Sequence, residues 1–165
     1  MGQPPAEADV EAQAFMDNPL VVVAPPDHPL AKARKIPLAR LQEETFLVRE
    51  SGSGTRIAME RFFNERGMRL KTGMEVGSNE AIKQSVQAGL GLGLLSRVTI
   101  EQELALKRLA VLDVADLPIM RHWYVVHRRG KRLSAVAEAF KQFVLKETAG
   151  LMDKEPHGPS RNKKR

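Results

Sequence analysis

The chain has 165 residues and 42% of them are hydrophobic, which is enough for one ordinary domain or two small lobes around a packed core. It contains no cysteine, so disulfides and thiolate catalysis are excluded. No apolar run approaches the roughly 18 residues of a membrane span, and the first 18 residues are too acidic for a signal peptide. We therefore predict a cytoplasmic protein that does not enter a membrane.

The net charge of +6 is concentrated at the end of the chain. Residues 154–165 hold five basic residues against one acidic residue, which leaves the rest of the chain nearly neutral. We predict that 149–165 form a disordered basic tail with only weak, salt-sensitive attraction to polyanions.

Apolar patterning predicts alternating strands and helices. The predicted elements are a buried strand at 20–24, a short helix at 38–44, a strand at 46–49, a helix from about Arg56 that Gly67 ends, a strand at 74–76, a helix from 79 into the Gly89–Gly93 region, strands at 92–95, 109–114 and 123–127, and a helix at 134–146. In the second long helix, Ile82, Val86 and Leu90 recur every four residues and predict its buried face. Two successive βα units indicate a parallel sheet with helices on its faces.

The turn after strand 46–49 has the composition of an anion site. Its candidate hydrogen-bond donors are Ser51, Gly52, Ser53, Gly54 and Thr55. The glycines allow backbone amides to converge, and the helix that follows adds unpaired N–H groups and the positive end of its dipole. A phosphate or a carboxylate fits such a turn. The alternative is a capped strand-to-helix turn that binds nothing.

A second polar turn, Ser78-Asn79, follows the strand at 74–76. Ligands of parallel sheets bind beyond the carboxyl ends of the strands, so both turns are expected to face one cleft. Arg56 can add positive charge there or pair with Glu60, its i+4 neighbour.

The sequence contains no catalytic signature. A P-loop and a Gly-x-Ser-x-Gly nucleophile turn are both missing. Of the four histidines, His122 and His127 fall on opposite faces of a predicted strand, and His28 suits either a ligand contact or a surface position. We expect Trp123 in a core or at a strand edge. We predict no catalytic residue, no metal site and no cofactor.

Two segments, 46–56 and 73–96 with its Ala-Gly-x-Gly-x-Gly ending, resemble the effector-binding region of LysR-type transcriptional regulators. The span 16–147 resembles the RuBisCO-operon regulators of that family. The resemblance implies an α/β, type 2 periplasmic-binding-protein-like fold with two Rossmann-like lobes, the first of them incomplete. Two crossing strands would join the lobes, near 20–26 and near 120–127.

On this resemblance, 1–26 would be a remnant of lobe one with the first crossover strand, and 27–119 a complete second lobe. Residues 120–148 would be the return crossover strand and the C-terminal helix of lobe one. Because the chain starts after the family's helix-turn-helix, we expect an N-terminally truncated protein. Unpaired strand edges and exposed apolar surface are expected at 20–24 and 123–127.

The resemblance implies the effector-sensing domain of a regulator of carbon-fixation genes, not an enzyme. Its partner would be a small anionic metabolite, held by the two turns. DNA binding would require the missing helix-turn-helix, and the full-length protein would be a homo-oligomer. Two alternatives stay open: a solute-binding protein for a phosphate-like oxyanion, and an enzyme on the same fold with Glu50 as its titratable residue.

Overall fold

The computed structural model describes residues 2–152, which divide into two compact units. One unit, here called the sheet unit, spans Asn18–Arg121. The other, the ribbon unit, combines the residues up to Asp17 with those from His122 onward. The chain therefore leaves the ribbon unit after its first strand and returns to it for the second.

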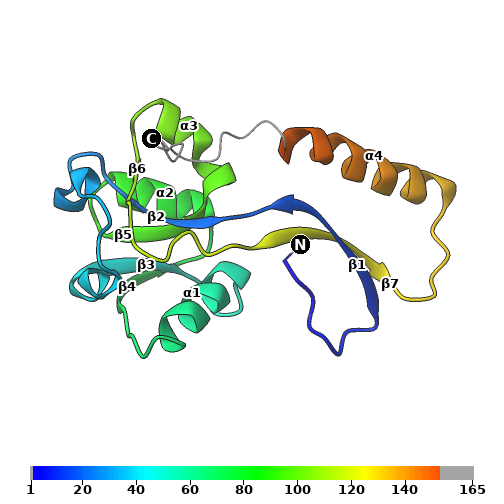
Figure 1. Ribbon diagram of the computed structural model, residues 1–165, viewed down its shortest axis with the longest axis horizontal. Coiled ribbons are helices and arrows are strands. Elements are labelled where there is room, and N and C mark those ends of the chain that lie inside the picture. Colours follow the sequence, from blue (N-terminus) through cyan, green and yellow to red (C-terminus); the bar gives the residue numbers. More distant parts are fainter. Residues whose placement is uncertain (1, 153–165) are drawn as a thin grey trace, which may run out of the picture. The chain divides into compact units, whose positions relative to one another are not determined.

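A five-stranded sheet in the order β4-β3-β5-β2-β6 forms the centre of the sheet unit (Figure 1). The strands are β2 (Leu20–Ala24), β3 (Thr45–Arg49), β4 (Lys71–Val76), β5 (Leu92–Ser96) and β6 (Ala110–Val111). β3 is parallel to β4 and β5, as expected for consecutive βα units, whereas β2 is antiparallel to β5 and β6. The sheet is therefore mixed, and the predicted parallel part is limited to three strands.

Helices cover both faces of this sheet (Figure 1). On one face, Met59 and Phe63 of α1 (Gly54–Asn64) pack with one set of alternating strand residues. On the other, Ile82 and Val86 of α2 (Asn79–Gln87) pack with the second set. The split follows from the two-residue period of strands, which sends successive side chains to opposite faces.

Several short helices complete the sheet unit. They are the 3-10 helices η1 (Pro29–Lys32), η2 (Leu38–Glu43) and η3 (Arg97–Ile100), and the α-helix α3 (Glu101–Ala105). The sequence predicted η2 but neither η3 nor α3. Gly67 follows α1 with a φ of +66°, which explains why the chain turns there. Leu90 was wrongly placed on the buried face of α2: the helix ends at Gln87, and Leu90 is 54% exposed.

Strand β2 differs from the expectation of an exposed edge. It pairs with β5 on one side and β6 on the other, and all five of its residues are buried. The expected unpaired edge at 20–24 is therefore wrong, because this strand belongs to the interior of the complete sheet.

Within residues 2–17 and 122–152, the ribbon unit contains two strands and one helix. Strand β1 (Val10–Asp17), which the sequence did not predict, pairs antiparallel with β7 (His122–Arg128). Helix α4 (Ala135–Met152) contacts β1. The strand at 123–127, where exposed apolar surface was predicted, pairs with β1 and its residues are half-buried. The exposed apolar side chains of this unit lie instead on α4, at Val136, Phe140 and Phe143.

Helix α4 includes residues 149–152, which the sequence analysis assigned to the basic tail. The rest of that predicted tail, 153–165, lies outside the described residues. None of the helices in the described part of the chain has both the length and the apolar character that a membrane span requires.

Candidate functional site

The turn after β3 is closed by one backbone hydrogen bond. The Ser53 N–H donates to the Glu50 carbonyl over 3.1 Å, and Gly52, the third residue of the turn, has a φ of +86°. A positive φ at this position is the signature of a type II turn and favours glycine. The Ser53 amide is thus already used within the turn and is not available to a ligand.

Unpaired amides lie one step further along the chain, at the start of α1. The Ile57 N–H donates to the Ser53 carbonyl over 2.9 Å, so the N–H groups of Gly54, Thr55 and Arg56 come before the first helical hydrogen bond. The hydroxyls of Ser51, Ser53 and Thr55 have no hydrogen-bond partner among residues 2–152; Ser53 in particular makes no side-chain cap. This end of α1 therefore offers both amides and hydroxyls to an anion.

The second predicted turn is partly structural. Ser78 is the N-cap of α2, and its Oγ accepts a 3.1 Å hydrogen bond from the Ala81 N–H. Oδ1 of Asn79 accepts a 2.5 Å hydrogen bond from Nη1 of Arg49. The Ser78 hydroxyl proton and the Asn79 side-chain amide remain as potential donors.

Arg49 links the two turns, a role that the sequence analysis missed. Its guanidinium donates to both carboxylate oxygens of Glu50, over 2.7 and 2.8 Å, while Nη1 reaches Asn79. The two turns consequently lie side by side at the carboxyl ends of β3 and β4. The signal for Arg49 was weak: a charged residue that ends an otherwise buried strand.

Glu50 was the only candidate for acid–base chemistry. The hydrogen bonds from Arg49 lower the pKa of Glu50, so its carboxylate stays ionised at neutral pH. An ionised, bidentately bound carboxylate is a poor general acid, and the enzyme alternative loses its candidate residue.

Arg56 pairs with carboxylates instead of facing a ligand alone. It donates to Glu60 over 2.8 Å, to Glu75, and to the Arg49 carbonyl over 3.1 Å. Its hydrogen bonds to the carboxylates, to Glu60 first and then to Glu75, raise the pKa of Arg56. Pairing with Glu60 was one of the two predicted roles, and it is the one that the structure has.

Arg121, at the other end of the sheet unit's sequence, also reaches this loop. Its Nη1 donates to the Gly54 carbonyl over 3.0 Å. Sequence reasoning could not find this contact, because the two residues are 67 positions apart.

Two buried oxygens near the ends of the strands lack hydrogen bonds. Within the described part of the chain, neither the Ser96 Oγ nor the Asn18 Oδ1 has a partner. Ser96 ends β5 and lies opposite Leu20 in the β2–β5 register. The edge that carries the two turns thus has buried side-chain oxygens without hydrogen-bond partners, which is unusual in a protein interior.

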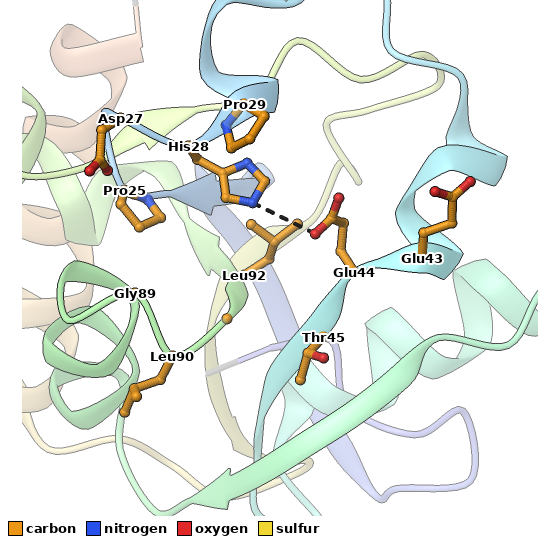
Figure 2. Close-up of a pocket in the computed structure, with 11 residues that line it drawn as sticks. Pro25, Asp27, His28, Pro29, Glu43, Glu44, Thr45, Gly89, Leu90 and Leu92 are labelled. Carbon is orange, nitrogen blue, oxygen red and sulfur yellow. Dashed lines mark ion pairs between the residues drawn. The ribbon is translucent and has the colours of Figure 1, made fainter.

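A cavity lies near the starts of β3 and β5, at the end of the sheet opposite the Ser51–Thr55 turn. It has a volume of about 450 Å³ and is lined by residues that include His28, Glu44 and Leu92 (Figure 2). Thr45 and Leu92 start β3 and β5, so this cavity lies away from the Ser51–Thr55 turn. Its carboxylates make it unsuitable for an anion.

The three histidines in the described part of the chain each have a nearby partner. Nδ1 of His28 accepts from the Leu30 N–H over 3.2 Å, and its Nε2 lies 3.6 Å from Glu44. His122 lies 3.3 Å from Asp17, and His127 lies 3.7 Å from Glu11. Across residues 2–152, no three His, Asp or Glu side chains are grouped in a way that could hold a metal ion.

Comparison of the sequence with known proteins gives a consistent set of relatives. Residues 1–149 match the family model described as LysR substrate binding domain. The chain is similar to a RuBisCO operon transcriptional regulator of Allochromatium vinosum, with 62% identity over 92% of the chain and 50% of the relative. It is also similar to the HTH-type transcriptional activator CmpR of Synechocystis, with 46% identity over 88% and 48%. The chain spans about half the length of these curated relatives.

The similar solved structures are also domains of regulatory proteins. The CcmR regulatory domain of Synechocystis in complex with 2-PG has a TM-score of 0.85 and 42% identity, covering 90% of this chain and 71% of that one. The effector binding domain of QuiR in complex with shikimate has a TM-score of 0.79 and 25% identity, covering 90% and 70%.

Proposed function

Because the chain belongs to the LysR substrate binding domain family, we propose that it is the effector-sensing part of a transcriptional regulator of carbon-fixation genes. The similar proteins named as RuBisCO operon regulators support this choice of genes. Family membership also establishes the fold class predicted from the sequence, α/β and type 2 periplasmic-binding-protein-like, since the similar solved structures are regulatory and effector-binding domains.

The proposed effector is a small anionic metabolite, and its proposed site is the edge formed by Ser51, Gly52, Ser53, Gly54, Thr55, Ser78 and Asn79. One observation carries this proposal: the amides of Gly54, Thr55 and Arg56 and the neighbouring hydroxyls lack partners at the positive end of α1. The anion 2-PG (2-phosphoglycolate) in the CcmR domain supports an effector of this charge.

An effector that binds one conformation more tightly than another shifts the population toward it, which is how such a domain would transmit a signal. DNA binding is proposed for a regulator of about twice this length, because relatives of that length are named HTH-type. We propose that this longer regulator is also a homo-oligomer. A regulator that acts on promoter DNA would work in the cytoplasm.

The alternative of an oxyanion solute-binding protein is not favoured. The relatives reported above are named as transcriptional regulators, and the similar solved structures are regulatory domains. The same names indicate a family of regulators and not of enzymes.

Replacing Ser53 and Thr55 together by alanine tests the proposed site. Each hydrogen bond to a charged group contributes about 1.5–3 kcal/mol, so the loss of two hydroxyl donors should weaken binding about tenfold or more. Titration calorimetry with 2-PG, sugar phosphates, phosphoenolpyruvate and NADPH measures the effect. Thr72→Ala on exposed β4 is the matched control and should bind as the wild type does.

Two outcomes would contradict the proposal at different levels. An unchanged affinity in the double variant would reduce the Ser51–Thr55 turn to a structural element. If none of these anions bound to the wild-type chain, the proposed effector class itself would be wrong.

A further inference from the structure

We propose that Arg121 provides the positive charge that selects a phosphate group of the effector. This inference rests on the proposed function, and it adds a residue that lies far from the Ser51–Thr55 turn in the sequence.

The guanidinium of Arg121 lies directly against the first residue of α1. Nη1 donates to the Gly54 carbonyl over 3.0 Å. Nη2 lies 3.2 Å from the point that a Cβ on Gly54 would occupy, which is a tight approach to the helix start. The cation is therefore next to the residue that begins the run of unpaired amides.

The backbone of Arg121 is held firmly. The Asn18 N–H donates to the Arg121 carbonyl over 2.7 Å, and Leu20 and Ile119 exchange two hydrogen bonds of 2.9 and 3.0 Å. Leu20 is fully buried in the centre of the sheet. Arg121 thus extends from a rigid pair of chain segments, which favours a preorganised contact over a flexible one.

The charges of the two arginines that contact the Ser51–Thr55 and Ser78-Asn79 turns from β3 and α1 are neutralised inside the protein. Arg49 is bound by the Glu50 carboxylate, and Arg56 is bound by Glu60 and Glu75. Arg121 has no carboxylate within ion-pair distance in the part of the chain that the structure describes. It is therefore the arginine of the three whose charge is available to an anion.

Burial strengthens the case for an external partner. Desolvation lowers the pKa of Arg121, yet an arginine stays protonated at neutral pH. A partly dehydrated cation without a counter-ion gains more from an incoming anion than an exposed one does, because the screening by water is reduced.

The geometry of the guanidinium suits phosphate. Arginine has five N–H donors, and the structure uses one Arg121 donor for the Gly54 carbonyl. The remaining donors can form the paired hydrogen bonds that phosphate oxygens accept, while the amides at the start of α1 bind the same group.

Calorimetry of the 165-residue chain with 2-PG, repeated at increasing sodium chloride, tests the inference. Arg121→Gln should weaken binding about 10- to 100-fold and reduce its dependence on salt, because the lost interaction is charged. Arg121→Lys keeps the charge and should recover much of the affinity and the wild-type salt dependence. The control is Arg61→Gln, since Arg61 lies on the same helix but is exposed and paired with Glu65.

Circular dichroism of each variant establishes whether it is folded. Wild-type affinity in Arg121→Gln, or equal losses in the Gln and Lys variants, would overturn the inference while leaving the proposed function intact. Should Arg121→Gln not fold, Arg121→Lys decides: retained affinity with wild-type salt dependence supports the inference, and lost affinity overturns it. If neither 2-PG nor any of the other anions named above bound the wild-type chain, the proposed function itself would be wrong, and the inference with it.

Discussion

In the sheet unit, helices cover both faces of the strands, whereas in the ribbon unit a single helix contacts a two-stranded sheet. The residue types are similar in the two regions, since β2 and β7 both contain consecutive valines. Every residue of β2 is nevertheless buried, and no residue of β7 is. The number of covering layers, not the hydrophobicity of the strand, therefore decides how much apolar surface leaves water.

This difference predicts that stability resides in the sheet unit, and a matched pair of phenylalanines gives the largest contrast. Phe46 on β3 is fully buried, whereas Phe140 on α4 is 65% exposed. Phe46→Ala should cost about 3–5 kcal/mol of unfolding free energy, and Phe140→Ala less than about 0.5 kcal/mol. Urea unfolding followed by circular dichroism measures both variants.

The single tryptophan, Trp123, lies in the ribbon unit, so its fluorescence reports that region separately. Equal costs of the two phenylalanine variants would show that the helix α4 face is packed in solution and that the contrast between the units is wrong.

The ion pairs of the sheet unit and the ribbon unit also differ in how deeply they are buried. In the sheet unit, Nζ of Lys83 on α2 lies 2.7 Å from Oε1 of Glu103 on α3, and both side chains are only 13% exposed. In the ribbon unit, Arg129 and Asp9 are 3.5 Å apart and about two-thirds exposed. Lys83 also lies 2.7 Å from Oε2 of Glu80, so Glu103→Gln removes one of its two carboxylate partners. The loss of this charged hydrogen bond should cost about 1.5–3 kcal/mol, whereas Asp9→Asn should cost less than about 0.5 kcal/mol.

The buried pair also predicts a dependence on pH. The hydrogen bond from Lys83 lowers the pKa of Glu103 in the folded protein. A lowered folded-state pKa contributes stability above the unfolded pKa of about 4.3 and loses it as the pH falls through the folded value. Urea midpoints measured between pH 7 and pH 3 should therefore fall less steeply in Glu103→Gln than in the wild type. Parallel curves for the two proteins would contradict this role of Glu103.

Local patterns in the sequence were sufficient for much of the sheet unit. The continuous β-branched run at 20–24 indicates a buried strand, and β2 is buried. The four-residue spacing of Ile82 and Val86 indicates a helix, and both side chains are buried in α2. Strand β1 was missed because its pattern is weak: half of its residues are exposed and none is buried. It is held by hydrogen bonds to β7, more than a hundred residues away, which no local pattern encodes.

The candidate site was predictable to a similar extent. The small residues of the Ser51–Thr55 turn gave its position, because glycine and hydroxyl residues at a helix start have a local meaning. Which arginine remains unpaired depends on tertiary contacts: Arg49 and Arg56 have acidic neighbours at β3, α1 and β4, whereas Arg121 arrives from a distant segment. Charge balance at such an edge cannot be obtained from the sequence alone.

The smallest expected effect concerns how tightly the sheet unit is packed. A Cβ on Gly93 of β5 would lie 2.8 Å from Cγ2 of Ile82 and 3.1 Å from Cγ2 of Val86, so Gly93→Ala must push α2 away from the sheet. Overpacking of this kind typically costs about 1–3 kcal/mol. Gly77, just before α2, has no atom within 4 Å of its added Cβ, and Gly77→Ala should change the unfolding free energy by less than about 1 kcal/mol. Urea unfolding of the two variants, followed by circular dichroism, measures the difference. A Gly93→Ala protein as stable as Gly77→Ala would mean that α2 can move outward at little cost, and that the sheet unit is packed no more tightly than the ribbon unit.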